Sequence, residues 1–285
     1  MLGFSNMFKS GVAVHVFGQS LLQDLSRDMD DNWHRQIHQQ KVERESTVRL
    51  ILNLKEVIQC LKPPLESSWS HYQGKNSYSK EESRKKEEVV AKWLSTLPSQ
   101  PNLALDIGCN TGTFTRICAR YAKLAVGIDN DAVCVDSINM GKPLNMLGLV
   151  MDFSDSTPSS GWQLRERLSF PSRVKPDVTL ALAVVHHLAL GCGIALDEVI
   201  RALIESSPIL FIEFISLEDD MAKALYLRRI SERPDYSVGA FIAAIAATGG
   251  QIECVESLSP TRTLYLVRRV NGPPEVCGKQ FSGLN

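Results

Sequence analysis

Two carboxylates and two glycines occur at the spacing of a ligand-binding turn between two strands. Asp106 lies near the end of a short apolar run, Gly108 and Gly112 bracket the residues that follow, and Asp129 ends the next apolar run. In a strand–turn–helix–strand unit, groups at the carboxyl ends of parallel strands meet the ligand. The pattern therefore predicts a nucleotide-type ligand site within residues 103–129, whereas the plain alternative is an ordinary βαβ unit with a tight turn.

The turn lacks the features of the two common phosphate-binding loops. A dinucleotide fingerprint needs three glycines, but Asn110 and Thr113 occupy the second and third positions. Asp106 would place a negative charge next to a pyrophosphate. No Gly-Lys-Ser/Thr follows the turn, which excludes a P-loop. The sequence therefore disfavours NAD and nucleoside triphosphates as ligands.

A ligand with a cationic group near the turn fits these residues better. S-adenosylmethionine carries an ammonium and a sulfonium there, and its carboxylate can accept hydrogen bonds from the N–H groups that begin the next helix. Asn110 tolerates positive φ almost as glycine does. Asp129 can accept both ribose hydroxyls, although an acid at that position is shared with NAD-binding proteins. The expected cofactor is therefore S-adenosylmethionine.

Several segments together resemble one known family. The segment D-I-G-C-N-T-G followed by G-I-D resembles motif I and its successor in class I S-adenosylmethionine-dependent methyltransferases. Further segments narrow the resemblance to methyltransferases related to the NoeA-type nodulation protein, over roughly residues 11–269. These segments are Trp69…Tyr72…Asn76-Ser77-Tyr78-Ser79, Ala183-Val184-Val185-His186-His187-Leu188, Phe211-Ile212-Glu213-Phe214 and Arg262-Thr263-Leu264-Tyr265-Leu266.

The resemblance extends the expected cofactor site beyond the turn. In class I enzymes an acid after the third strand binds the adenine amino group and an apolar neighbour packs on the ring, roles that match Asp152 and Phe153; the alternative is that Asp152 only caps a turn. Tyr78 belongs to an aromatic segment that could fold over the ligand as a lid or pack against the sheet edge. The expected cofactor-binding residues are Asp106, Gly108, Asn110, Gly112, Asp129, Asn130, Asp152, Phe153 and Tyr78.

Two adjacent histidines end the expected fourth strand. Neighbours on an extended chain point to opposite sides, so at most one of His186 and His187 should face the acceptor. By position His186 resembles the histidine that pairs with a glutamate in C-methylating domains of polyketide synthases, and Glu213 on the fifth strand could be that partner. We expect His186, with its pKa raised by Glu213, to be the proton-removing base and His187 to be structural. The competing interpretation is that a histidine here only packs or bonds the backbone.

The sequence favours a small-molecule acceptor with a hydroxyl or an activated carbon. The Asn/Asp-Pro-Pro-aromatic motif of nucleobase amine methyltransferases is replaced by Val-Val-His-His at residues 184–187, and no paired-glutamate loop of arginine methyltransferases is visible. Two alternatives remain open. One is an S-adenosylmethionine-binding module without turnover; the other is an RNA or protein methyltransferase.

The pattern of strands and helices predicts an α/β fold. Apolar runs at 103–107, 124–128, 146–151, 177–185 and 208–215 alternate with helical segments, and a hairpin of 251–258 with 263–269 follows. This predicts a Rossmann-like, mostly parallel seven-strand sheet with helices on both faces and a terminal antiparallel hairpin. The expected organisation is a helical N-terminal cap or arm (1–64), a linker or lid (65–79), the methyltransferase domain (80–270) and a disordered tail (271–285).

Composition limits the classes of partner and compartment. The 285 residues carry a formal net charge of −1, which does not suggest nucleic acid or a membrane as the main partner. Seven cysteines without a C-x-x-C spacing predict free thiols and no metal site. No apolar run has the length of a membrane span, so we expect a cytoplasmic protein, with an organelle transit peptide left open. The oligomeric state and the acceptor stay undetermined.

Overall fold

The computed structural model describes residues 44–60, 67, 79–228 and 235–270. The chain divides into two compact units, Met1–Leu65 and Glu66–Asn285. The described part of the first unit is helix α5 (Arg44–Cys60), which exposes apolar side chains such as Ile51 and Ile58. The rest of the expected cap or arm (1–64), the expected linker or lid (65–79) apart from Ser67 and Ser79, and the expected tail (271–285) lie outside the described residues.

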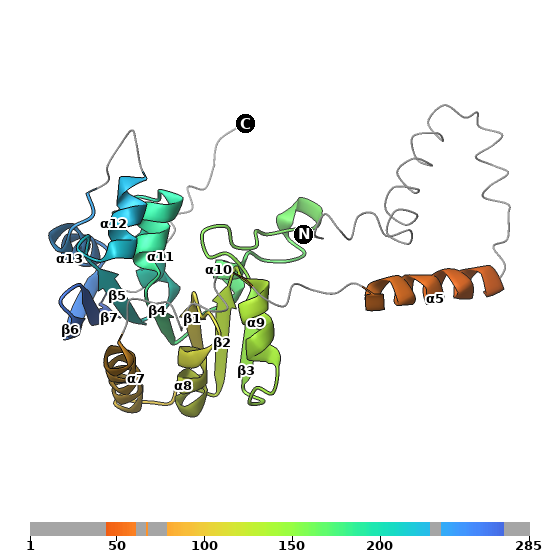
Figure 1. Ribbon diagram of the computed structural model, residues 1–285, viewed down its shortest axis with the longest axis horizontal. Coiled ribbons are helices and arrows are strands. Elements are labelled where there is room, and N and C mark those ends of the chain that lie inside the picture. The colour runs from red at the N-terminus through yellow and green to blue at the C-terminus, as the bar shows by residue number, and fades with distance from the viewer. Residues whose placement is uncertain (1–43, 61–66, 68–78, 229–234, 271–285) are drawn as a thin grey trace, which may run out of the picture. The chain divides into compact units, whose positions relative to one another are not determined.

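The second unit contains a seven-stranded mixed sheet in the order β3-β2-β1-β4-β5-β7-β6 (Figure 1). The first five strands in sequence pair in parallel, whereas β7 lies antiparallel between β5 and β6. This is the predicted sheet with its terminal hairpin. The strands are β1 (Leu103–Ile107), β2 (Leu124–Asp129), β3 (Met146–Val150), β4 (Val178–Ala181), β5 (Ile209–Ile215), β6 (Gly250–Ser259) and β7 (Arg262–Arg269).

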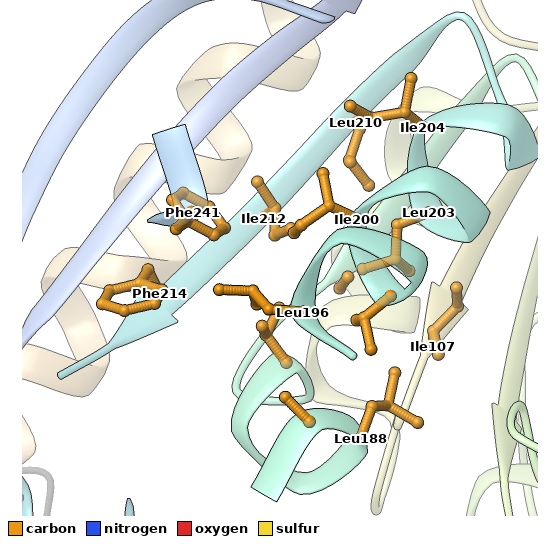
Figure 2. Packing of buried hydrophobic residues seen from close by; sticks show 14 of the residues in the cluster. Ile107, Leu188, Leu196, Ile200, Leu203, Ile204, Leu210, Ile212, Phe214 and Phe241 are labelled. Carbon is orange, nitrogen blue, oxygen red and sulfur yellow. The ribbon is translucent and has the colours of Figure 1, made fainter. Parts of the chain in front are cut away.

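Two apolar clusters cover the two faces of this sheet. Because successive residues of a strand point to opposite faces, β5 contributes Leu210 and Ile212 to one cluster and Phe211 to the other. Helices α11 and α13 pack on the first face, as Figure 2 shows around Ile200, Leu203 and Phe241, and α7 and α8 pack on the second. The helices of this unit are α7 (Lys80–Ser95), α8 (Thr113–Tyr121), α9 (Ala132–Asn139), α10 (Phe170–Arg173), α11 (Leu196–Ser206), α12 (Asp220–Leu227) and α13 (Val238–Ala247).

The strand order reverses at β1, which is where an α/β sheet of this kind opens a crevice. The chain runs outward from β1 through β2 to β3 and then returns to β4 on the other side of β1. Helices that leave the carboxyl ends of β1 and β4 diverge from one another, so the loops between them border a crevice at that edge. The topology therefore places the acidic turn of residues 106–112 at the point where a ligand is expected.

The fourth strand is shorter than its apolar pattern predicts. The run at 177–185 suggests a continuous strand, but β4 ends at Ala181, and Ala183 has a positive φ of 57°. A π-helix, η3 (His187–Cys192), follows in place of an extended chain. Between β3 and α10 the chain forms a 3₁₀ turn, η2 (Trp162–Leu164). Among the described residues, no helix is both long and apolar enough to cross a membrane.

Candidate functional site

The turn after β1 requires glycine at Gly108. Its φ is 68°, and a Cβ atom there would lie 2.6 Å from Cγ2 of Val184 in the loop after β4. Asn110 also adopts a positive φ, 47°, which the sequence anticipated from the tolerance of asparagine for this region. The turn therefore approaches the neighbouring loop closely and leaves its backbone open toward the crevice.

Asp129 lies at the carboxyl end of β2 and organises the turn. Its Oδ2 accepts a hydrogen bond from the backbone N–H of Asn110 at 2.8 Å, and its Oδ1 accepts one from Asp131 N–H at 2.9 Å. Each carboxylate oxygen has two lone pairs, so both can still accept a hydroxyl. Burial raises the pKa of Asp129, and the backbone donors oppose that rise. The residue can therefore hold the turn and receive a diol together.

Asp106 does not line the pocket but lies beneath the turn. Its side chain is 2% exposed and accepts a hydrogen bond from the Thr115 hydroxyl at 2.6 Å. Burial raises the pKa of Asp106 to about 7, because the low-dielectric surroundings penalise the charged form. The expectation that this carboxylate faces a cationic ligand group is corrected: in this structure its partner is the N-terminal part of α8.

A cavity of about 320 Å³ opens at the carboxyl edge of β1, β2 and β4. Its lining combines the turn, the acid after β2, the residues after β3 and the loop after β4. Asp152 also holds its own turn, because its Oδ1 accepts hydrogen bonds from Ser154 N–H and Oγ–H at 2.8 and 2.6 Å. The lining residues are Ile107, Gly108, Asn110, Ile128, Asp129, Asn130, Met151, Asp152, Phe153, Leu182, Ala183, Val184, His187, Leu188, Gly191 and Cys192.

The structure brings most of the expected cofactor residues into this single pocket. Gly108, Asn110, Asp129, Asn130, Asp152 and Phe153 all line it. Gly112 lies outside the lining: it has φ 83° and packs against Ile138, where a Cβ atom would approach Cγ1 to 2.7 Å. Tyr78 lies outside the described residues. No group of three or more His, Cys, Asp or Glu side chains placed to hold a metal ion occurs among the residues that the structure describes.

The wall formed by the loop after β4 was missed by sequence reasoning. Ala183 and Val184, together with Leu188, Gly191 and Cys192 of the π-helix, close one side of the pocket. π-helical turns are often associated with functional sites, but no sequence pattern for one is visible here. The only available signal was the resemblance of residues 183–188 to a family motif, which does not specify the backbone path.

The two histidines have the opposite placement from the one expected. His187 lines the pocket, whereas His186 is 1% exposed and neither of its ring nitrogens has a hydrogen-bond partner in the described part of the chain. The ring centroids lie 4.1 Å apart. Burial is the main cause that lowers the pKa of both imidazoles, and the positive charge of Arg262 lowers both further. The expected rise in the pKa of His186 is therefore wrong in direction.

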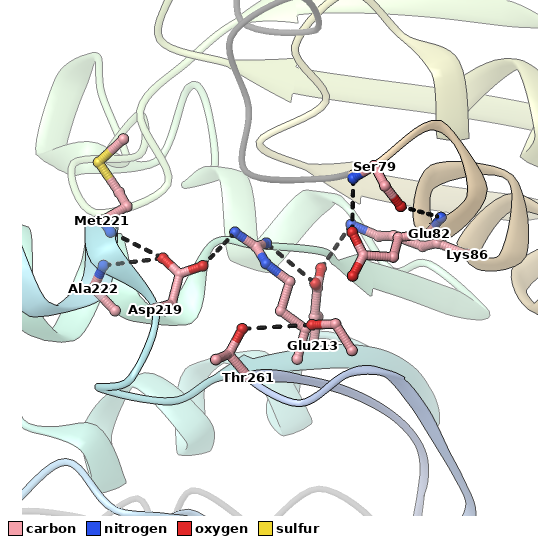
Figure 3. A network of polar contacts seen from close by, with 10 residues as sticks. Ser79, Glu82, Lys86, Glu213, Asp219, Met221, Ala222 and Thr261 are labelled. Carbon is pink, nitrogen blue, oxygen red and sulfur yellow. Dashed lines mark hydrogen bonds and ion pairs between the residues drawn. The ribbon is translucent and has the colours of Figure 1, made fainter.

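Glu213 does not pair with His186 but belongs to a buried ion cluster (Figure 3). Its Oε2 lies 2.6 Å from Lys86 Nζ on α7, and its Oε1 lies 3.5 Å from Arg262 Nη1 at the start of β7. Arg262 Nη2 in turn donates to Asp219 Oδ2, the N-cap of α12, at 2.9 Å. The Glu213 carboxylate therefore pairs with Lys86 and Arg262. The expected pair of Glu213 with His186 is corrected.

The chain is similar in sequence to one curated protein. The chain is 32% identical over 210 residues to nodulation protein NoeA of Rhizobium meliloti (strain 1021), a match that covers 72% of this chain. The chain spans less than half, 43%, of the length of that protein. No protein-family model matches the chain.

Solved structures resemble the chain more weakly. The N-methyltransferase NodS from Bradyrhizobium japonicum WM9 matches with 12% identity and a TM-score of 0.49, over 67% of this chain and 98% of that one. Magnesium protoporphyrin IX methyltransferase (ChlM) from Synechocystis PCC 6803 matches with 16% identity and a TM-score of 0.45, over 66% and 80%. Both TM-scores are below 0.5, so the fold assignment rests on the strand order of the chain itself. The chain is therefore similar in sequence to NoeA over the 210 matched residues, and its own strand order gives it the Rossmann-like, mostly parallel seven-strand sheet that the sequence predicts.

Proposed function

We propose that the chain is an S-adenosylmethionine-dependent methyltransferase whose cofactor occupies the pocket at the carboxyl edge of the sheet. The observation that carries the proposal is Asp129. Its carboxylate lies at the end of β2, lines the pocket and is fixed by two backbone N–H groups. A fixed carboxylate with lone pairs to spare is the group that recognises a ribose diol.

The rest of the pocket suits the other parts of the cofactor. Asp152 can accept a hydrogen bond from the adenine amino group, and Phe153 beside it offers an apolar face to the ring. Gly108 and Asn110 leave the backbone of the turn open, and the N-terminus of α8 follows. That end of a helix carries a partial positive charge, which favours the carboxylate of the methionine moiety.

The proposed reaction is an in-line displacement on a small-molecule acceptor with a hydroxyl or an activated carbon. The sulfur–methyl bond breaks, the methyl–acceptor bond forms, and the sulfonium becomes a neutral thioether while the acceptor loses a proton. His187 is the candidate to take that proton, because it lines the pocket and its lowered pKa keeps the imidazole neutral near pH 7. Neither His186 nor Glu213 is among the residues that line this pocket.

Calorimetry with purified chain tests the cofactor assignment. S-adenosylmethionine and S-adenosylhomocysteine should bind, and NAD should bind far more weakly, since Asn110 and Thr113 replace two of the three glycines of a pyrophosphate-binding turn. Tight NAD binding with no binding of S-adenosylmethionine would overturn the proposal.

A second measurement separates an enzyme from a binding module. Methyl-labelled S-adenosylmethionine is incubated with the chain and a cell extract, and formation of S-adenosylhomocysteine is followed. We expect conversion above that of a His187→Ala variant with unchanged cofactor affinity. Binding without any conversion would instead identify the chain as a cofactor-binding module.

A further inference from the structure

Among the residues that the structure describes, three side chains beyond the carboxyl ends of β4 and β5 carry buried polar atoms without a hydrogen-bond partner. They are His186, 1% exposed, with both ring nitrogens unpaired; Tyr236, 4% exposed, with its hydroxyl unpaired; and Ser216, whose Oγ is buried and unpaired. Burying a hydrogen-bonding group without a partner costs free energy, and native proteins rarely retain such groups. Three of them in one region indicate that the partner is a molecule that binds there.

Electrostatic influence links His186 and Tyr236 to the buried ion cluster of Lys86, Glu213, Arg262 and Asp219, and a backbone hydrogen bond links Ser216 to the residue before Arg262. His186 lies within the electrostatic influence of Arg262 and Lys86. Tyr236 lies within that of Glu213 and Asp219, and its ring stacks on Phe214 of β5 with centroids 5.0 Å apart.

Ser216 directly follows the last residue of β5, and its backbone N–H donates to the Thr261 carbonyl at 2.8 Å. Thr261 precedes Arg262 of the cluster. The backbone of Ser216 is therefore held next to the start of β7, where Arg262 joins the ion cluster.

This region is continuous with the cofactor pocket. His187 lines the pocket, and its ring lies 4.1 Å from that of His186, centroid to centroid. A methyl acceptor must reach the cofactor from a neighbouring site, and the region behind the histidine pair adjoins the pocket through these two rings. Entry requires local opening, because the three groups are closed to water in this structure.

The chemistry of the region favours an uncharged ligand group. Lys86 and Arg262 carry two positive charges, and Glu213 and Asp219 carry two negative charges at salt-bridge distances. A neutral imidazole offers one donor and one acceptor, and each hydroxyl offers a donor and acceptor lone pairs. Such a set complements a group that both donates and accepts hydrogen bonds, which is a hydroxyl or a primary or secondary amide.

We propose that His186, Ser216 and Tyr236 form the recognition site for a neutral hydroxyl or amide group of the methyl acceptor. The inference rests on the proposed methyltransferase function. The acceptor supplies the hydrogen bonds that the protein lacks. The unpaired atoms of the three side chains lower the free energy of unfolding of the chain without its ligand, and binding of the acceptor offsets this loss.

The first test is the effect of removing one hydroxyl on stability. Tyr236→Phe removes an unpaired group and should leave the Tm unchanged or raise it. Tyr265→Phe is the matched control, because Tyr265 belongs to the same aromatic cluster but its hydroxyl, unlike that of Tyr236, is not a buried atom without a partner. The control should lower the Tm by about 2–4 °C, the shift for losing about one hydrogen bond in a domain of this size. A Tyr236→Phe variant that loses as much stability as the control overturns the proposal.

The second test measures binding of small probes to the chain saturated with S-adenosylhomocysteine. Acetamide and glycerol are the neutral probes, acetate and methylammonium are the charged ones, and the signals of labelled tyrosine and histidine rings report binding by NMR. We expect saturable binding of a neutral probe that shifts the Tyr236 and His186 signals. Affinity should fall about fivefold in Tyr236→Phe and in Ser216→Ala, the scale of one lost hydrogen bond, and should be retained in Tyr265→Phe.

The outcomes separate this inference from the proposed function. If S-adenosylhomocysteine binds but no neutral probe does, or if a charged probe binds more tightly, the recognition site is wrong and the cofactor assignment stands. If S-adenosylhomocysteine itself does not bind, the proposed function fails and the acceptor site fails with it. The inference is supported if the affinity for a neutral probe falls about fivefold in Tyr236→Phe and in Ser216→Ala but is unchanged in Tyr265→Phe.

Discussion

At the scale of the residue, Asp129 accepts hydrogen bonds from two backbone N–H groups and, in the proposed function, also binds the ribose hydroxyls. Asp129→Ala should weaken S-adenosylmethionine binding by roughly 2–4 kcal/mol, because charge-assisted hydrogen bonds to the ribose are lost; Asp129→Asn should cost less. Asp131→Ala is the control: that carboxylate caps α9 by accepting from Val133 and Cys134 N–H, so its loss should lower stability by about 1 kcal/mol and change affinity far less. Calorimetry and thermal unfolding measure the two effects, and equal affinity in wild type and a folded Asp129→Ala variant would contradict the assignment.

Asp106 should make stability depend on pH in a direction unusual for an acid. The folded pKa of about 7 exceeds the ordinary value of 3.8, so the folded chain retains a proton that the unfolded chain has released. The free energy of unfolding therefore falls as pH rises from about 4 to 7, by up to roughly 4 kcal/mol, and stays low above that range. Asp106→Asn, which can still accept from Thr115, should be more stable than wild type at pH 8 and similar at pH 4. Thermal unfolding at several pH values measures this, and a difference that does not vary with pH would contradict it.

At the scale of the element, the turn between β1 and α8 depends on the close approach of the loop after β4. Gly108→Ala should destabilise the chain by more than about 2 kcal/mol, since it combines a strained positive φ with a Cβ contact of 2.6 Å to Val184. Gly141→Ala is the matched control, because Gly141 has φ 66° but no atom within 4 Å of the added Cβ, and should cost about 1–2 kcal/mol. Urea unfolding compares the two. Similar losses would show that only the backbone angle matters at Gly108.

At the scale of the whole unit, the buried ion cluster joins α7, β5, β7 and the start of α12. Lys86→Met should lower the free energy of unfolding by about 3–5 kcal/mol, because it leaves the buried Glu213 carboxylate without the partner at 2.6 Å. Lys85→Met is the control one residue away: Lys85 pairs with Glu256 at 3.2 Å with both side chains over 40% exposed, and its loss should cost about 0–1 kcal/mol. Denaturant unfolding measures both. Equal effects would show that the buried pair contributes no more than a surface pair.

The sequence predicted the sheet well because the evidence for it is local. Buried parallel strands are continuous apolar runs, so β1 was predicted with the bounds that the structure shows, and the alternation of strands with helices predicted the parallel pairing of the first five strands. The part of the pocket near β1, β2 and β3 was predicted for the same reason. Gly108, Asp129 and Asp152 each follow or end a strand that the apolar pattern locates, and parallel strands bring their carboxyl ends to one edge.

The errors occurred where a side chain's partner comes from a distant part of the chain. Nothing near Glu213 in sequence indicates that it faces Lys86, 127 residues earlier, rather than His186. The positive φ of Ala183 and the π-helix then rotate the chain so that His187 reaches the pocket and His186 is buried, which an extended strand to residue 185 would not predict.

By itself, the sequence determined the fold, the turn after β1 and the pocket residues at the ends of β1, β2 and β3, because strand ends and glycine turns are set by local pattern. Only the tertiary structure decided which histidine faces the pocket, which ions pair with Glu213, and which buried groups are left without partners. These properties depend on contacts between segments far apart in the chain. Burial then sets their charge states through desolvation, an effect that no sequence spacing encodes.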